Sequence, residues 1–369
     1  IAESAASLLK VISGRYSDRL GKRKPLALAG YGISTLARPV MALAMTGWHV
    51  VALRFFDRIG KGVRTSPRDA LISESVTADT RGLAFSFHRM MDHAGAVAGP
   101  LTGLLVLRLF IGTSNLWQQG AASLSPPEMT ALRWLFACAL LPGLAAMLSL
   151  WLGVRDIPHP VSAHPTSKPR HAAAPKGLPR QFYIYLLAVI LFTLGNSSDL
   201  FLIFYAQTTF GLGLGWTVIL WIFLHFAKIV FSIPGGRLSD ILGRRAVIIS
   251  GWAVYMGVYI AIPLLSSLHQ IWLVLLVYGL YYGLTEGAEK ALVADFTPVE
   301  KRGTAYGLYH GAVGFAALPA SLLFGVFWAV LGPRVAFFTG AALAFLAMIV
   351  LLTLGRQAGH QVTMPAITD

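Results

Sequence analysis

The sequence predicts an all-α membrane protein made of two related six-helix bundles, because its composition is apolar and long apolar runs recur. Of its 369 residues, 56% are hydrophobic and only 12% are charged, and the mean hydropathy is +0.65. Soluble domains carry about 25% charged residues. Runs of about 20 apolar residues are long enough to cross a hydrocarbon core of about 30 Å as helices. These observations exclude an ordinary water-soluble protein.

Eleven apolar runs predict helices. In chain order we expect them at 1–16, 25–46, 48–76, 82–111, 130–153, 181–210, 215–237, 246–266, 269–296, 303–331 and 334–355. A stretch rich in Pro, His and basic residues interrupts this pattern at 155–180 and predicts a linker. We therefore expect an incomplete amino-terminal bundle at 1–154, a carboxy-terminal bundle at 181–355 and a cytoplasmic tail at 356–369.

The positive charges lie in alternate loops. The formal net charge is +14 at pH 7. Segments 15–24, 155–180, 237–245 and 301–302 are basic, whereas 113–130, 211–217 and 266–270 contain no Lys or Arg. This asymmetry predicts a multi-pass protein of the bacterial inner membrane, with its linker and basic loops in the cytoplasm. It accounts for the charge without nucleic-acid binding. The single cysteine, Cys138, excludes a disulfide within the chain.

A loop motif occurs twice. Segments 14–23 and 236–245 share the pattern Gly-Arg-x-Ser-Asp-x-Leu-Gly-Lys/Arg-Arg at a shift of 222. Arg81-Gly82 matches Arg302-Gly303 at a shift of 221, so the two halves are parallel duplicates. About 55 residues of the second half precede its motif, but only 13 precede the first. We therefore expect a twelve-helix plan from which the first helix and part of the second, roughly 40 residues, are missing.

Two six-helix halves with this loop resemble the major facilitator superfamily, and the similarity covers the whole chain. The resemblance implies alternating access by two rocking bundles. It also implies that the motif residues control the conformation. Asp18 would form and release salt bridges, and Gly14 and Gly21 would permit tight turns. The other interpretation is a basic loop that only orients the protein. The motif residues are Gly14, Asp18, Arg19, Gly21 and Arg23, and Gly236, Asp240, Gly243, Arg244 and Arg245.

A glycine motif in the run 82–111 is similar to the antiporter motif of this superfamily, Gly-x-x-x-Gly-Pro-x-x-Gly. It comprises Gly95, Gly99, Pro100 and Gly103, although Leu104 stands where a further Gly is usual. We expect its small residues to let helices approach closely. Generic glycine packing is the alternative. The motif favours export by exchange, as in twelve-helix proton antiporters, within a poorly characterised bacterial subgroup.

Charged residues in the run 48–76 predict a polar pathway. Arg54, Asp57, Arg58 and Lys61 are spaced by three or four residues, which places them along one side of a helix. Charges at membrane depth are costly and face a cavity or one another. Asp57 can pair with Lys61, and the excess of positive charge suits an anionic or zwitterionic solute. A structural ion network is the alternative, and it is favoured for the more peripheral Arg64, Arg68 and Asp69.

Other acids predict proton-binding sites. Asp92 is expected near the bilayer centre, either as a proton carrier or as a partner of Arg54 or Arg58. Asp199, with Asn196 before it, interrupts an apolar run as a solute or proton site, or as a cap at a helix break.

The run 269–296 adds Glu286 and Lys290, which are four residues apart and can pair. Of the two, Glu286 is the deeper candidate. Weaker candidates are His88, Arg89 and His93, Lys228 and His310, and, as interface salt bridges, Glu289 and Asp295.

The function that follows is secondary transport. The sequence contains no phosphate-binding Gly-x-x-x-x-Gly-Lys-Ser/Thr loop, no metal-site spacing and no nucleophile elbow, so we expect neither an enzyme nor a cofactor other than the proton gradient. The leading hypothesis is proton-coupled efflux of a small organic solute, by a monomer that contacts lipid, solute and protons. Uptake or facilitated transport of an anionic solute is the second hypothesis. A membrane receptor or scaffold without transport is the third.

Overall fold

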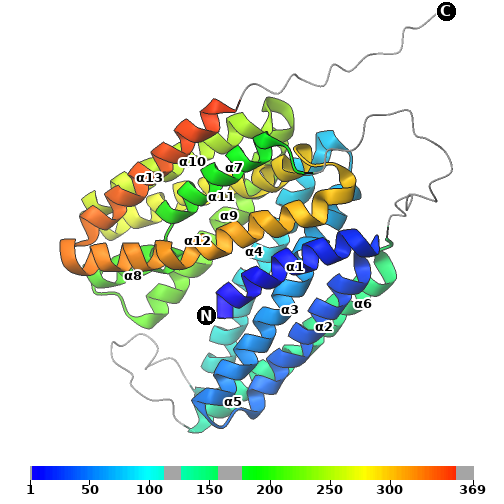
Figure 1. Ribbon diagram of the computed structural model, residues 1–369. Helices are drawn as coiled ribbons and strands as arrows, with labels where there is room; N and C mark the ends of the chain where they lie inside the picture. The colour runs from blue at the N-terminus through cyan, green and yellow to red at the C-terminus, as the bar shows by residue number, and fades with distance from the viewer. Residues whose placement is uncertain (1, 112–125, 157–176, 355–369) are drawn as a thin grey trace, which may run out of the picture.

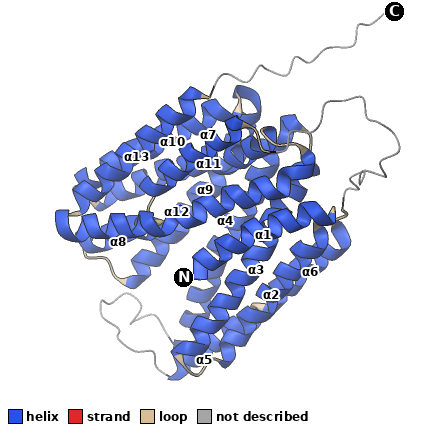
Figure 2. Ribbon diagram, in the orientation of Figure 1, coloured by secondary structure: helices blue, strands red, loops and turns tan. Residues whose placement is uncertain are grey.

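A computed structural model describes residues 2–111, 126–156 and 177–354, and within these ranges every regular element is helical (Figure 2). The helices are α1 (Ala2–Leu20), α2 (Lys24–Val40), α3 (Gly47–Glu74), α4 (Arg81–Ile111), α5 (Pro126–Cys138), α6 (Leu140–Gly153), α7 (Arg180–Gly195), α8 (Asp199–Phe210), α9 (Leu214–Leu242), α10 (Arg244–Ala261), α11 (Leu268–Asp295), α12 (Arg302–Leu331) and α13 (Pro333–Thr353). Short 3₁₀ turns lie at Met41–Leu43, Ala78–Thr80, Ile262–Leu264 and Val299–Lys301. The expected all-helical fold is confirmed.

The eleven expected runs correspond to these helices, but two runs are broken. The run 130–153 is interrupted between α5 and α6, and the run 181–210 between α7 and α8. Eight spans of the described residues are long and apolar enough to cross a membrane. Helices α1, α3 and α4 are not among them, and α3 and α4 carry several of the charged side chains discussed below.

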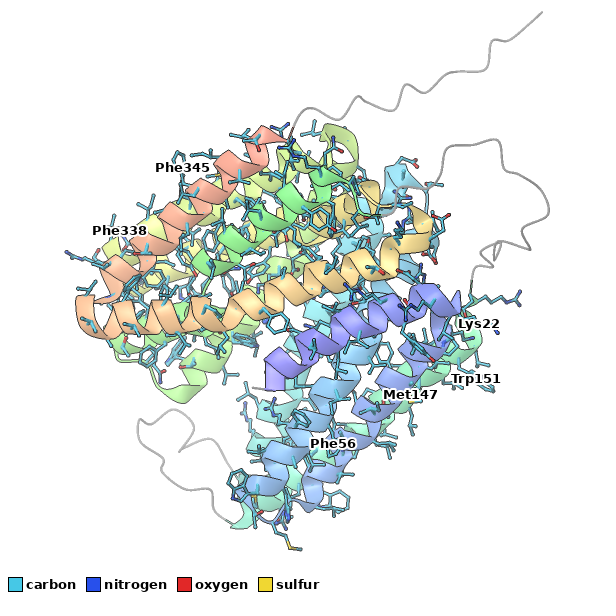
Figure 3. The ribbon with its side chains drawn as sticks, in the orientation of Figure 1. Lys22, Phe56, Met147, Trp151, Phe338 and Phe345 are labelled. Carbon is cyan, nitrogen blue, oxygen red and sulfur yellow. The ribbon has the colours of Figure 1, made fainter. Side chains whose placement is uncertain are left out.

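The helices form two bundles that lie side by side, α1–α6 and α7–α13 (Figure 1). They meet where α1 packs on α12 and where α4 packs on α9 and α11. The second bundle is filled with aromatic side chains, of which Trp252, Tyr255, Tyr259 and Tyr278 are almost completely buried. Figure 3 shows Met147 and Trp151 on the outer side of the first bundle, and Phe338 and Phe345 on that of the second. An apolar outer surface of this kind suits contact with lipid.

The loop motif differs in shape from the expectation, because α1 continues to Leu20 and contains Gly14 and Asp18. Gly21, with φ of +61°, makes the turn. Gly14 does not turn the chain. It lets α1 approach α12, since a Cβ atom there would lie 2.1 Å from the carbonyl oxygen of Gly303. In the second copy, Gly243 has φ of +90° and makes the corresponding turn.

The antiporter-like motif does not mediate close packing in the described residues. A Cβ atom at Gly95 or Gly99 would meet nothing within 4 Å, and at Gly103 only Leu135, at 3.7 Å. Helix α4 also remains continuous through Pro100. Most of the expected linker at 155–180 and the whole tail at 356–369 lie outside the described residues.

Candidate functional site

The two bundles are joined where the two loop motifs lie, which we call the basic-loop end. Asp18 of α1 accepts hydrogen bonds from the backbone N–H groups of Gly303 (2.9 Å) and Thr304 (2.6 Å). These residues begin α12, and the first N–H groups of a helix have no partner inside it. A carboxylate there also interacts favourably with the helix dipole. Asp18 of one bundle therefore caps a helix of the other.

The second copy of the motif makes the reciprocal contact. Asp240 of α9 accepts hydrogen bonds from the backbone N–H groups of Gly82 (3.0 Å) and Leu83 (2.8 Å), at the start of α4. Arg244 forms an ion pair with Asp240 and donates to the carbonyl oxygen of Ala78 (2.7 Å). The repeat in the sequence therefore becomes a pair of equivalent contacts between the bundles.

Arg23 holds the first of these contacts together. Its guanidinium lies 2.9 Å from the Asp18 carboxylate and 2.6 Å from that of Glu74, and it donates to the carbonyl oxygen of Val299 (3.2 Å). Burial lowers the pKa of Arg23, but the hydrogen bonds and charges of Glu74 and Asp18 raise it by more, so the pKa lies above its ordinary value. The guanidinium is therefore charged at neutral pH.

Deeper in the interface, Asp69 of α3 is the centre of an ion cluster. Its carboxylate is fully buried and lies 2.9 Å from Arg68, 3.0 Å from Lys290 and 2.8 Å from Nε2 of His310. Lys290 and His310 belong to α11 and α12 of the other bundle. We call these four residues the Asp69 cluster. It compensates a buried negative charge across the interface.

Glu286 of α11 is the centre of a second cluster, in which the acid belongs to the second bundle and its basic partners belong to the first. Its carboxylate pairs with Arg89 and lies 2.8 Å from Nε2 of His93, and both partners belong to α4 of the other bundle. Nδ1 of His93 lies 3.1 Å from Nδ1 of His225 on α9. One proton between these two nitrogens makes the contact a hydrogen bond, whereas protons on both would make them repel. Glu286, Arg89, His93 and His225 are the Glu286 cluster.

Asp199 begins α8, just after the break in the apolar run 181–210. Its carboxylate accepts hydrogen bonds from the hydroxyl groups of Tyr278 (3.0 Å) and Tyr282 (2.7 Å) and pairs with Lys228 at 2.8 Å. The Lys228 ammonium also lies 3.5 Å from the centre of the Tyr282 ring, which is a cation–π contact. Lys228 is therefore a buried partner of Asp199.

Glu289 lies one turn after Glu286 but faces the interior of its own bundle. Its carboxyl group accepts hydrogen bonds from Nε1 of Trp252 (3.0 Å) and from the hydroxyl group of Tyr309 (2.8 Å). The Tyr185 hydroxyl donates to its backbone carbonyl oxygen (3.0 Å). These donors are all neutral, so the expected interface salt bridge is wrong for Glu289.

The candidates in the run 48–76 lie apart from these clusters. Arg54 is exposed. Asp57 lies 3.1 Å from Arg38 of α2, and so it pairs with that residue and not with Lys61. Arg58 and Lys61 are partly buried. By contrast Asp69, which the sequence ranked lower, is a central residue of the interface.

Several further candidates have partners or roles other than those expected. Asp92 is 43% exposed and pairs with Arg89 (3.1 Å) and His88 (3.7 Å), and it reaches neither Arg54 nor Arg58. Glu286 and Lys290 do not pair with each other, because each has its partners in the other bundle. The helix does break before Asp199, but the side chain that caps α8 is that of Ser198.

Other positions follow from the fold. Asn196 ends α7 and donates to the hydroxyl group of Tyr281 at 3.2 Å. Asp295 pairs with Arg81 across the interface at 2.9 Å, as expected. Arg245 donates to the backbone oxygen of Leu352 at 2.5 Å. Arg19 lines a surface depression of about 330 Å³ at the basic-loop end.

Sequence analysis missed several residues that contact the buried charges, namely His225, Trp252, Tyr278, Tyr282 and Tyr309. A signal for His225 existed, because it stands three residues before Lys228 in an otherwise apolar run. The tyrosines also recur at helical spacing, in Tyr278, Tyr281 and Tyr282 ahead of Glu286. Aromatic residues are common in helix cores, however, and their spacing alone does not identify hydroxyl groups that bind a carboxylate.

Comparisons with known proteins cover nearly the whole chain. The family model of the Major Facilitator Superfamily matches residues 3–287 and 214–364. An uncharacterized MFS-type transporter of Methanocaldococcus jannaschii is 31% identical over 357 residues, which are 95% of this chain and 83% of that protein. Over 100 residues, 27% of this chain and 25% of the relative, the identity to the multidrug resistance protein MdtH of Cronobacter sakazakii is 33%.

Solved structures agree in fold. The human organic anion transporter MFSD10 is similar over 95% of this chain and 82% of its own, with a TM-score of 0.75 and 18% identity. The proton:xylose symporter XylE, bound to 6-bromo-6-deoxy-D-glucose, is similar over 96% of this chain and 85% of its own, with a TM-score of 0.71 and 15% identity. At such identities the likeness concerns the fold alone.

Proposed function

The chain belongs to the Major Facilitator Superfamily, and from this premise we propose that it is a proton-coupled exporter of a small organic solute that works by alternating access. It is a multi-pass membrane protein and a secondary transporter, not an enzyme. Beyond family membership, the proposal specifies the proton as the coupling ion and export as the direction of transport. It also specifies a monomer in the bacterial inner membrane, with the basic loops in the cytoplasm.

The observation that supports the proposal is a set of reciprocal ion pairs, in which each bundle supplies the basic partners of an acid on the other. Asp69 of the first bundle is compensated by Lys290 and His310 of the second. Glu286 of the second is compensated by Arg89 and His93 of the first. Separating the bundles at this depth would leave uncompensated charges in a low-dielectric interior, which is strongly unfavourable.

A proton or a solute can offset that cost. A proton that neutralises a carboxylate removes its need for a cation, and a charged solute can replace the lost partner. Separation of the bundles would then be coupled to proton binding on one side and to solute binding on the other. Glu286 and Asp199 are the acids that support this cycle, and Arg89 and Lys228 are the cations that their neutralisation would expose. The 100-residue likeness to a multidrug resistance protein favours export.

The test uses inverted membrane vesicles with a preset pH gradient and a pH-sensitive dye. Benzoate, ethidium and xylose serve as an anionic, a cationic and a neutral probe. We expect at least one probe to collapse the gradient in the wild type, and Glu286→Gln to abolish the collapse. Asp79→Asn is the matched control, because Asp79 is an exposed carboxylate in the short turn before α4. A gradient that no probe alters, while labelled probes still cross the membrane, would exclude proton coupling.

Facilitated transport of an anionic solute is the second candidate, and Arg64 favours it. Its guanidinium lies over the Tyr31 ring at 4.5 Å and donates to the hydroxyl group of Ser34 (2.6 Å). None of the described side chains gives it a carboxylate partner. If this candidate is correct, labelled benzoate equilibrates without moving protons, and Arg64→Gln stops it.

A further inference from the structure

Glu289 differs from the other acids at membrane depth in the charge of its partners. Asp69, Asp199 and Glu286 are each held by at least one cationic side chain. Among the described residues, no Lys, Arg or His lies within ion-pair distance of Glu289. A carboxylate at this depth is costly without a cation, and the protonated acid avoids that cost.

The hydrogen bonds also assign the proton to one oxygen. Trp252 Nε1 can only donate, so Oε1 of Glu289 must be an acceptor. The Tyr309 hydroxyl, 2.8 Å from Oε2, can donate or accept. A proton on Oε2 would therefore donate to the Tyr309 oxygen, and both oxygens of the neutral acid would keep a partner. The neutral form fits the site when the Tyr309 O–H rotates away from Oε2, and no heavy atom needs to move.

The groups around Glu289 come from three helices besides its own. They are Tyr185 of α7, Trp252 of α10 and Tyr309 of α12, and none of them carries a charge at neutral pH. On α11 itself, Glu286 and Lys290 are the nearest ionisable neighbours in sequence, and both are engaged with the other bundle. Glu289 is only partly buried, which leaves the group within reach of water.

Two pairs of consecutive residues connect this site to the bundle interface. On α11, Glu289 faces its own bundle while the next residue, Lys290, pairs with Asp69. On α12, Tyr309 contacts Glu289 while the next residue, His310, contacts Asp69. A change of charge at Glu289 therefore acts on the two helices that hold the Asp69 cluster together.

We propose that Glu289, hydrogen-bonded to Trp252 and Tyr309, holds the coupling proton while the bundles are joined at the basic-loop end. This inference rests on the proposed function, because it identifies the proton site of that transport cycle. When the bundles separate at this end, Oε2 loses its proton to water on the basic-loop side, which completes the transfer of the proton. The carboxylate that remains attracts the Lys290 ammonium, competes with Asp69 for it, and so opposes rejoining of the bundles until a proton binds again.

The first test needs no solute. Infrared spectroscopy of the purified protein in liposomes detects the carbonyl band of a protonated carboxylic acid at neutral pH. We expect this band in the wild type and in Glu286→Gln, and its loss in Glu289→Gln. The glutamine keeps the size of the side chain, accepts from Trp252 and donates to Tyr309, so the variant should fold. A band that survives unchanged in Glu289→Gln would overturn the proposal.

The second test separates this proposal from the proposed function. In the vesicle assay, Glu289→Gln should reduce probe-driven proton movement at least tenfold, while exchange of labelled for unlabelled probe continues. If the wild type couples protons and Glu289→Gln couples them equally well, the Glu289 assignment is wrong and proton coupling stands. If the wild type moves no protons, the proposed function fails, and the infrared band still decides whether Glu289 is protonated.

Discussion

Neutralising Asp18 should open the bundles at the basic-loop end. Asp18 accepts two backbone hydrogen bonds from the start of α12, accepts one from the Thr304 hydroxyl (2.7 Å), and pairs with Arg23. In Asp18→Asn one amide oxygen can still accept from Gly303, but the NH₂ group faces the N–H of Thr304, which is also a donor. The variant therefore loses the charge and at least one contact between the bundles.

The magnitude follows from these contacts. A hydrogen bond to a charged group contributes about 1.5–3 kcal/mol, so the loss should be about 2–3 kcal/mol. Since about 1.4 kcal/mol is a tenfold change, the ratio of open to joined molecules should rise by about 30- to 140-fold. Asp240→Asn removes the equivalent contact with α4. If both contacts stabilise the same joined state, the double variant should shift the free-energy difference between joined and open molecules by about 4–6 kcal/mol.

The assay is a distance measurement between spin labels. Lys22→Cys and Ile241→Cys place labels on exposed positions of the two bundles at this end, and Cys138→Ser removes the single native cysteine. We expect longer distances in Asp18→Asn, longer still in the double variant, and no change in the exposed control Asp79→Asn. Unchanged distances in the double variant would show that these two carboxylates do not hold the bundles together.

Three further predictions concern the interior. A Cβ atom at Gly287 would lie 2.0 Å from a serine hydroxyl of α4, so Gly287→Leu should force the labelled positions apart; unchanged label distances would contradict this. Lys228→Met should destabilise the protein by about 3–5 kcal/mol by stranding Asp199, and Asp199→Asn in that background should restore the melting temperature in detergent. His225→Phe should leave Nδ1 of His93 without its hydrogen-bond partner and lower the melting temperature in detergent, and an unchanged melting temperature would contradict this.

How much of the site could be predicted depends on whether its contacts are local or repeated. The two loop motifs were identifiable because Asp18 and Asp240 recur at a constant shift, which fixes equivalent places in two equivalent bundles. Asp199 stood out because a lone acid in an apolar run needs a partner. The partner itself, Lys228, is 29 residues away on another helix, and nothing in the spacing identified it.

The pairing of Glu286 with Lys290, which their spacing predicted, failed for the same reason. Glu286 and Lys290 are four residues apart on one helix, but their partners are on helices of the other bundle. An exposed helix pairs its charges along its own surface, because solvent surrounds it. At a helix interface the neighbouring helix offers partners that also compensate for the loss of water, so contacts between helices replace contacts along the helix.

The membrane class, the approximate helix positions, the repeated loop motif and the polar residues that need partners could be predicted from the amino-acid sequence, because apolar length, charge asymmetry and repeat spacing are properties of the chain. Which of these residues meet depends on the packing of the helices. This packing placed Asp69 and Glu286 opposite cations of the other bundle and left Glu289 among neutral donors. The physical reason is that the cost of a buried charge depends on its neighbours within a few ångströms, and in a bundle those neighbours come from distant segments of the chain.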